Sequence, residues 1–457
     1  MKRWIIVAFS MLFFLGLNAQ NVTITGRSNK TETLMRLFVI EDLLNETEKQ
    51  VAECQTDANG NLILEGDVKQ ILPAKIYVGL ESVDIILTPN ATYDIEIIVP
   101  EQKEDVSYFE KELPTLRVKH ATDKGLYRQI IISEEIINSY LIEHFNQIYR
   151  GRQLGYIDSI QNAINRELPD IKSDYVKDYN RYKIAAIRLG LSTDGGKKVI
   201  NEYYDGKPVL YYQSAYIDLF KELFDHQFNK TIYDIHALND AFAEGPISFK
   251  NYLDTDPLMA QNSQLAELVT IYNLQKLCYG ERQTKQLAIN HLNYIKEHTK
   301  YAEHKGIIGD FFTKYNRLAP GANATDFTLK DCNGKEVSLS DYKKDVVLLQ
   351  FVDNQSATLD RQLSRLNELH HQWQDSVQIL TIATRDKIAA FGKQFDERHY
   401  DWPLLDLGNN ILLLEAYNVR LFPEYILIAP NMKIGQAPAP TPERYLEERV
   451  RAIYRKK

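Results

Sequence analysis

Residues 346–352 read VVLLQFV, and this stretch decides the fold of the C-terminal third of the chain. Only Gln350 interrupts the apolar run, which is typical of a strand covered on both faces. Helical spacing of apolar residues follows over 359–373, a second buried strand over 377–383 and a further helix over 388–395. A strand over 425–428 and a closing helix over 442–454 continue the alternation, which indicates an α/β domain.

The segments around this strand resemble extracytoplasmic thioredoxin-like proteins of the TlpA and ResA type, within the wider AhpC/TSA-like group. The resemblance rests on Ala319-Pro320-Gly321, on 333–342 (NGKEVSLSDY), on 346–351 and on 417–423 (YNVRLFP). It covers the last third of the chain and predicts a thioredoxin-like domain over 317–457. The upstream regions resemble, more weakly, the N-terminal parts of multidomain proteins of this type in Bacteroidetes.

The resemblance implies a Trp-Cys-x-x-Cys motif between the central strand and the next helix, and this chain departs from it. Gln355 stands in place of the Trp, Ser356 in place of the nucleophilic Cys and Leu359 in place of the resolving Cys. Disulfide exchange needs a thiolate, which neither Ser356 nor Leu359 can supply. The peroxiredoxins, relatives with one peroxidatic Cys, fail as a match for the same reason. We therefore expect no catalytic residue here, and we expect Ser356 or Asn354 to cap the helix.

Pro423, preceded by Phe422, is the second diagnostic position. The resemblance implies that Pro423 is a cis-proline facing the former active site, where Phe422 offers backbone groups to an extended polypeptide. Two interpretations stay open. Either Pro423 only shapes the fold, or the groove still binds a peptide or protein without chemistry.

The three cysteines, Cys54, Cys278 and Cys332, are odd in number and far apart, with no C-x-x-C spacing. The sequence does not decide whether any of them is bridged or reactive. The alternative hypothesis is therefore an enzyme, namely a divergent thiol-disulfide oxidoreductase that uses a remaining cysteine, with Cys332 as the first candidate.

Residues 1–19 have the pattern of a secretory signal peptide: a basic start, an apolar run over 4–17 and a small residue at Ala19. No Cys lies near this segment, so lipid attachment is not expected. We expect a periplasmic or otherwise extracytoplasmic protein without an integral membrane segment after cleavage.

The middle of the chain is predicted to form two further domains. Apolar and polar residues alternate in short runs over 20–100, which favours an all-β sandwich. Three- and four-residue apolar spacing dominates 101–316 and favours an all-α bundle. The predicted fold class is multidomain: a β-sandwich, a helical middle region and a C-terminal α/β thioredoxin-like domain.

Composition restricts the partners of this 457-residue chain. A net charge of -8 without a basic run argues against nucleic acid. No cofactor motif is present, and His291, His298 and His304 lack the spacing of a metal site. The 28 tyrosines fit helix packing, with carbohydrate stacking as a second interpretation. That second interpretation would make the protein an accessory of glycan or nutrient uptake.

Together these features predict an exported, non-redox protein of the cell envelope that binds a protein or peptide partner or serves as a scaffold. The identity of the partner, the oligomeric state and the choice between periplasm and cell surface do not follow from the sequence.

Overall fold

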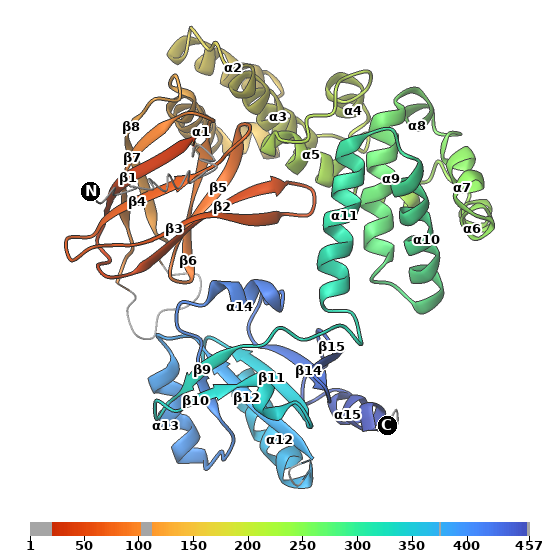
Figure 1. The fold of residues 1–457 in the computed structure, drawn as a ribbon. Helices are drawn as coiled ribbons and strands as arrows, with labels where there is room; N and C mark the ends of the chain where they lie inside the picture. Colours follow the sequence, from red (N-terminus) through yellow and green to blue (C-terminus); the bar gives the residue numbers. More distant parts are fainter. Residues whose placement is uncertain (1–20, 102–111, 374–375, 455–457) are drawn as a thin grey trace, which may run out of the picture.

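The computed structural model describes residues 21–101, 112–373 and 376–454. Figure 1 shows three regions in chain order: β-sheets in red and orange, helices from yellow to teal, and a mixed helix and strand region from teal to blue. This succession confirms the predicted order of an all-β, an all-α and an α/β region. The predicted signal peptide, residues 1–19, lies outside the described residues.

The N-terminal region is a sandwich of two sheets. Its strands are β1 (Val22–Ser28), β2 (Leu34–Asp42), β3 (Thr47–Gln55), β4 (Asn61–Gly66), β5 (Leu72–Val78), β6 (Glu81–Leu87), β7 (Thr92–Ile98) and β8 (Thr115–Ala121). They form the sheets β4-β1-β7-β8 and β3-β2-β5-β6. Buried and exposed residues alternate strictly along β4, so one face of the strand joins a core shared by both sheets.

Strand β8 corrects the boundary near residue 100 that was predicted between the β and helical regions. It pairs antiparallel with β7, from Tyr93 opposite Ala121 to Ile98 opposite Thr115. None of its residues is fully buried, so the apolar alternation that marks a strand is weak in this segment. The β-region therefore extends to Ala121.

The middle region is a bundle of mostly short helices. They are α1 (Leu126–Glu143), α2 (Gly155–Glu167), α3 (Asp174–Gly190), α4 (Lys197–Tyr203), α5 (Ser214–Phe224), α6 (Ile235–Glu244), α7 (Pro246–Leu253), α8 (Pro257–Gln261), α9 (Ser263–Leu277), α10 (Arg282–His298) and α11 (Ala302–Arg317). Tyr182, Tyr204 and Tyr216 pack against one another in its core. The hydroxyl of Tyr204 donates to the carbonyl oxygen of Tyr216 at 2.8 Å. These contacts favour packing as the reason for many tyrosines.

The C-terminal region is built on a seven-stranded sheet in the order β10-β9-β13-β12-β11-β14-β15. Its elements are β9 (Thr328–Asp331), β10 (Glu336–Ser338), β11 (Val346–Val352), α12 (Ala357–Trp373), β12 (Val377–Ala383), α13 (Ile388–Arg398), β13 (Leu404–Asp406), α14 (Ile411–Ala416), β14 (Glu424–Ala429), β15 (Lys433–Gln436) and α15 (Leu446–Tyr454). Every residue of β11 is buried, and its side chains alternate between two apolar cores. The strand is therefore covered on both faces, as its sequence predicted.

The three regions contact one another around the turn between β2 and β3. The Lys314 ammonium on α11 donates to the carbonyl oxygens of Asn45 and Glu46 in this turn, both at 2.8 Å. In the same last turn of α11, Arg317 pairs with Glu415 of α14 at 3.3 Å. The helical region is thereby tied to both of its neighbours.

Candidate functional site

The candidate site lies at the carboxyl end of β11, where the chain turns into α12. Ser356 precedes the helix directly, and its Oγ accepts a hydrogen bond from the backbone N–H of Leu359 at 3.1 Å. Ser356 therefore caps α12, as expected. The turn is also fastened to the neighbouring strand, because the Thr384 hydroxyl donates to Oδ1 of Asp353 at 2.7 Å.

Gln355 is held by the neighbouring helix α13. Its Nε2 donates to Oε1 of Gln394 at 2.9 Å, and Nε2 of Gln394 donates to Oδ1 of Asp360 at 2.8 Å. This chain of amides joins the turn, α13 and α12. The position at which the resemblance implies a Trp is thus occupied by a side chain that ties the turn to α13.

Leu359 belongs to the interior of the domain. Its side chain is 1% exposed and packs in the apolar core that also contains Leu363 and Phe391. The position of the resolving Cys therefore contributes to packing and presents no group to solvent.

The loop before β14 borders this turn. The Phe422–Pro423 peptide bond is cis, as the resemblance implied. Because β14 runs antiparallel to β11 with Glu424 opposite Phe351, Pro423 lies beside the end of β11. In contrast to Leu359, Leu421 and Phe422 are 76% and 36% exposed. The structure thus brings both predicted pairs of positions to the same edge of the sheet.

A chain of buried hydrogen bonds links β11 to the elements packed around it near this end of the sheet. Gln350 donates through Nε2 to the Tyr425 hydroxyl at 3.0 Å, and that hydroxyl donates to Oε1 of Gln362 at 2.9 Å. On the other side, the Thr381 hydroxyl donates to Oε1 of Gln350 at 2.8 Å and accepts from Nε1 of Trp402 at 2.9 Å. Both polar atoms of the Gln350 side chain, the single polar residue of β11, are therefore hydrogen-bonded, by partners too distant in sequence to be recognised beforehand.

The three cysteines are free thiols in separate parts of the molecule. Cys278 is buried at the end of α9, and this burial raises the pKa of its thiol to about 12. Partial burial also raises the pKa of Cys54 on β3. Both groups are thus disfavoured as thiolates near neutral pH.

Cys332 is exposed, but it lies away from the candidate site. Strand pairing aligns Lys330 of β9 with Asp406, then with Ala383 and finally with Val352 of β11. Three strand spacings separate β9 from β11, which corresponds to about 14 Å. The backbone N–H of Cys332 bonds to the carbonyl oxygen of Leu404, so Cys332 lies across the sheet from Ser356, roughly level with Gln350 of β11.

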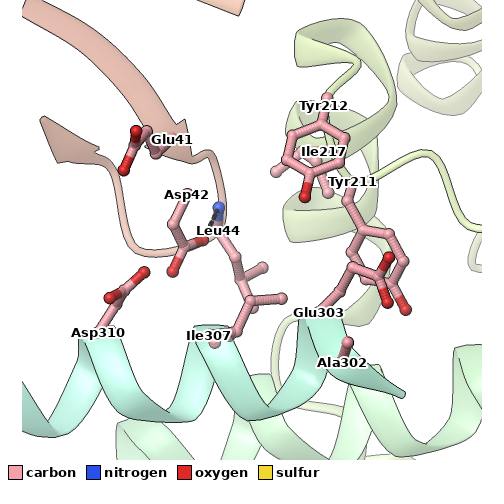
Figure 2. Close-up of a pocket in the computed structure, with 11 residues that line it drawn as sticks. Glu41, Asp42, Leu44, Tyr211, Tyr212, Ile217, Ala302, Glu303, Ile307 and Asp310 are labelled. Carbon is pink, nitrogen blue, oxygen red and sulfur yellow. Dashed lines mark hydrogen bonds between the residues drawn. The ribbon is translucent and has the colours of Figure 1, made fainter. Parts of the chain in front are cut away.

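A second concave feature, of about 260 Å³, lies between the β2–β3 turn and α11 (Figure 2). Glu41 and Asp42 line it from the end of β2, Glu303 and Asp310 from α11, and Tyr211 from the loop before α5. Burial, followed by repulsion from Asp42 and Glu41, raises the pKa of Asp310. The cavity is therefore acidic, and its surroundings disfavour the ionised form of Asp310.

Tyr211 is backed by a buried relay that the sequence did not reveal. Its hydroxyl lies 2.7 Å from Nε2 of His304, and Nδ1 of His304 lies 2.6 Å from Oε1 of Glu267. His304 is completely buried, so the relay fixes the tyrosine in place. The sequence pattern draws attention only to His304. Tyr211 and Glu267 come from a loop and another helix and share no local pattern with it.

Within residues 21–101, 112–373 and 376–454, no group of three or more His, Cys, Asp or Glu side chains could hold a metal ion. None of the helices described is both long and apolar enough to span a bilayer.

Comparison with known proteins identifies the C-terminal domain. The AhpC/TSA family profile matches residues 320–437. Thiol-disulfide oxidoreductase ResA from Geobacillus kaustophilus is 30% identical over 131 residues, which cover 28% of this chain and 75% of that protein. This chain belongs to the TlpA/ResA-like thioredoxin-fold family. The ResA protein of Bacillus subtilis is 26% identical over 124 residues, covering 27% and 69% of the two chains.

Two solved structures are each similar to under a third of the chain. A putative thiol-disulfide oxidoreductase from Bacteroides vulgatus is 20% identical and covers 30% of this chain and 98% of that chain, with a TM-score of 0.28. A putative thiol:disulfide interchange protein DsbE from Chlorobium tepidum is 21% identical, covers 30% and 98%, and has a TM-score of 0.27.

Proposed function

We propose that this protein is an exported, non-redox member of its family that binds a protein or peptide partner, or serves as a scaffold, in the cell envelope. The observation that carries the proposal is the state of the redox-motif positions. Ser356 is a helix cap and Leu359 is a core residue, so neither can form or pass on a disulfide. Binding at the loop before Pro423 needs no thiol and is compatible with this arrangement.

The exposed apolar side chains of Leu421 and Phe422 support the binding part of the proposal. They flank the start of β14, where a polypeptide would lie if it used the groove that the resemblance implies. Large exposed apolar groups at the rim of a groove are typical of interaction surfaces.

The alternative is thiol-disulfide exchange through Cys332. The strand order argues against cooperation between this thiol and the loop before Pro423, because four strand spacings, about 19 Å, separate β9 from β14. A reaction of Cys332 would therefore need a substrate site of its own.

The two functions are distinguished by a disulfide reductase assay. The full mature protein is incubated with insulin and dithiothreitol, beside an active ResA protein as positive control and a Cys332→Ser variant. We expect insulin reduction by the wild type and by the variant to equal the rate with dithiothreitol alone. Activity of the wild type that disappears in Cys332→Ser would overturn the proposal in favour of the alternative.

A further inference from the structure

Two neighbouring cavities lie where the helical region meets the thioredoxin-like domain. Their volumes are about 300 Å³ and about 320 Å³. Both are lined by Tyr279 from the α9–α10 turn, Lys314 from α11, and Asn418 and Arg420 from the loop before Pro423. We call this continuous feature the interdomain cleft. It adds a second wall, from the helical region, to the loop that carries the predicted groove.

The walls of the interdomain cleft offer apolar anchors. Tyr279 is 72% exposed on the helical side, and Leu421 is 76% exposed on the thioredoxin-like side. Between them, Leu318, Pro320 and Pro438 line the cleft. Exposed aromatic and aliphatic groups around a concave surface are suited to the side chains of a bound segment.

The charge of the interdomain cleft is opposite to that of the chain. Its lining includes five basic side chains and two acidic ones: Lys276, Lys285, Lys314, Arg317 and Arg420, with Glu46 and Glu424. Their salt-bridge partners outside the lining are Asp225, Glu415 and Lys221. With these partners counted, six basic side chains face four acidic ones in a protein of net charge -8.

Two of the lysines account for this excess. Lys285 lies over the ring of Tyr315, with its ammonium 5.0 Å from the ring centroid, and Lys314 donates to two carbonyl oxygens. Within the described parts of the chain neither forms a salt bridge. Burial lowers the pKa of Lys314, and the carboxylates of Glu415 and Asp42 offset this shift only in part. An ammonium group has three donors, so Lys314 retains one for a ligand.

We propose that the interdomain cleft binds an acidic, extended segment of a partner protein. Lys285, Lys314 and Arg420 pair with its carboxylates, while Tyr279 and Leu421 cover its apolar side chains. This inference rests on the proposed function, since it uses the loop before Pro423 as a binding surface. It adds the chemistry of the partner and a direct role for the helical region.

Fluorescence anisotropy of labelled decapeptides tests the inference with the full mature protein. One peptide alternates Glu with Leu, and a second alternates Lys with Leu. We expect the Glu peptide to bind more tightly than the Lys peptide, and its affinity to fall as salt is added. Lys285→Glu should weaken binding of the Glu peptide by about tenfold or more. The matched variant Lys296→Glu, on the same helix but outside both cavities, should bind like the wild type.

The possible failures are separable. Equal binding of both peptides that is lost in Leu421→Asp would overturn the acidic specificity and leave the proposed function intact. Equal effects of Lys285→Glu and Lys296→Glu, at unchanged melting temperatures, would also overturn the role of the cleft. Absence of binding by either peptide would count against both the inference and the proposed function.

Discussion

The two loops at the carboxyl end of the central strand differ in the direction of their side chains. In the turn into α12, Ser356 bonds to the backbone of its own helix and Leu359 is 1% exposed. In the loop before β14, Leu421 and Phe422 are 76% and 36% exposed. The first loop is closed by interactions within the protein, whereas the second presents apolar groups to solvent.

Under the proposed function, this difference separates thiol chemistry from binding within the thioredoxin-like domain. Thiol-disulfide exchange would need cysteines at positions 356 and 359, at the start of α12. Here Ser356 caps the helix and Leu359 packs in the core. The proposed binding uses the backbone and side chains before Pro423, which belong to the loop before β14. Loss of the thiols therefore does not require loss of the binding surface.

The largest effect is expected for a matched pair of leucine substitutions. Leu359→Ala should lower the free energy of unfolding by about 3 kcal/mol, because it leaves a cavity in a packed core. Leu421→Ala should change it by less than about 0.5 kcal/mol, because the side chain is mostly in water. Urea unfolding of both variants measures the difference. Equal losses would contradict the contrast between a closed and an open loop.

The next effect concerns the buried hydrogen bonds beneath both loops. Tyr425→Phe removes the hydroxyl that joins Gln350 to Gln362 and leaves two buried amide groups without this partner. We expect a loss of about 2 kcal/mol in the free energy of unfolding. Tyr445→Phe, at an exposed tyrosine of the same domain, is the control and should be neutral. If Tyr425→Phe leaves the free energy of unfolding unchanged, these buried hydrogen bonds do not stabilise this end of the sheet.

The helix cap should have a smaller effect. Ser356→Ala removes the acceptor for the N–H of Leu359 and should cost about 1 kcal/mol. Ser356→Asp should preserve most of the stability, because a carboxylate caps the same N–H and suits the helix N-terminus. Thermal unfolding compares the three proteins. If the alanine variant is as stable as the wild type, Ser356 is not needed for structure and its role must be sought elsewhere.

The smallest effect concerns the carboxyl group of Glu424 at the start of β14. Burial raises the pKa of Glu424 above its ordinary value of 4.5, so the ionised form is disfavoured in the folded protein. The protonated side chain contributes to stability below pH 4.5. This contribution is lost as the pH rises through the raised pKa of Glu424. Glu424→Gln should therefore stabilise the protein by roughly 0.5 kcal/mol at pH 7. The gain should disappear below about pH 4.5, which melting curves over this range would test.

The sequence predicted the C-terminal fold well because its pattern is local. The run at 346–352 and the helical spacing after it follow from burial on one or both faces of each element. Residues 355, 356, 359, 422 and 423 could be located from the resemblance alone. Strand β8 was missed because none of its residues is fully buried, and a half-exposed strand leaves little apolar alternation.

Contacts between distant segments could not be predicted. The bond between Gln350 and Tyr425 joins residues 75 positions apart, and the relay from Glu267 through His304 to Tyr211 joins two helices and a loop. The interdomain cleft likewise depends on how the helical region docks onto the loop before Pro423. Such features arise from tertiary packing, which leaves no periodic signal in a single sequence.

The most direct measurement is insulin reduction by the wild type beside the Ser356→Cys/Leu359→Cys double variant. The account predicts an inactive wild type and an active double variant, because the fold around the start of α12 is retained and only the thiols are missing. An active wild type would contradict the central claim that the domain has lost thiol-disulfide chemistry.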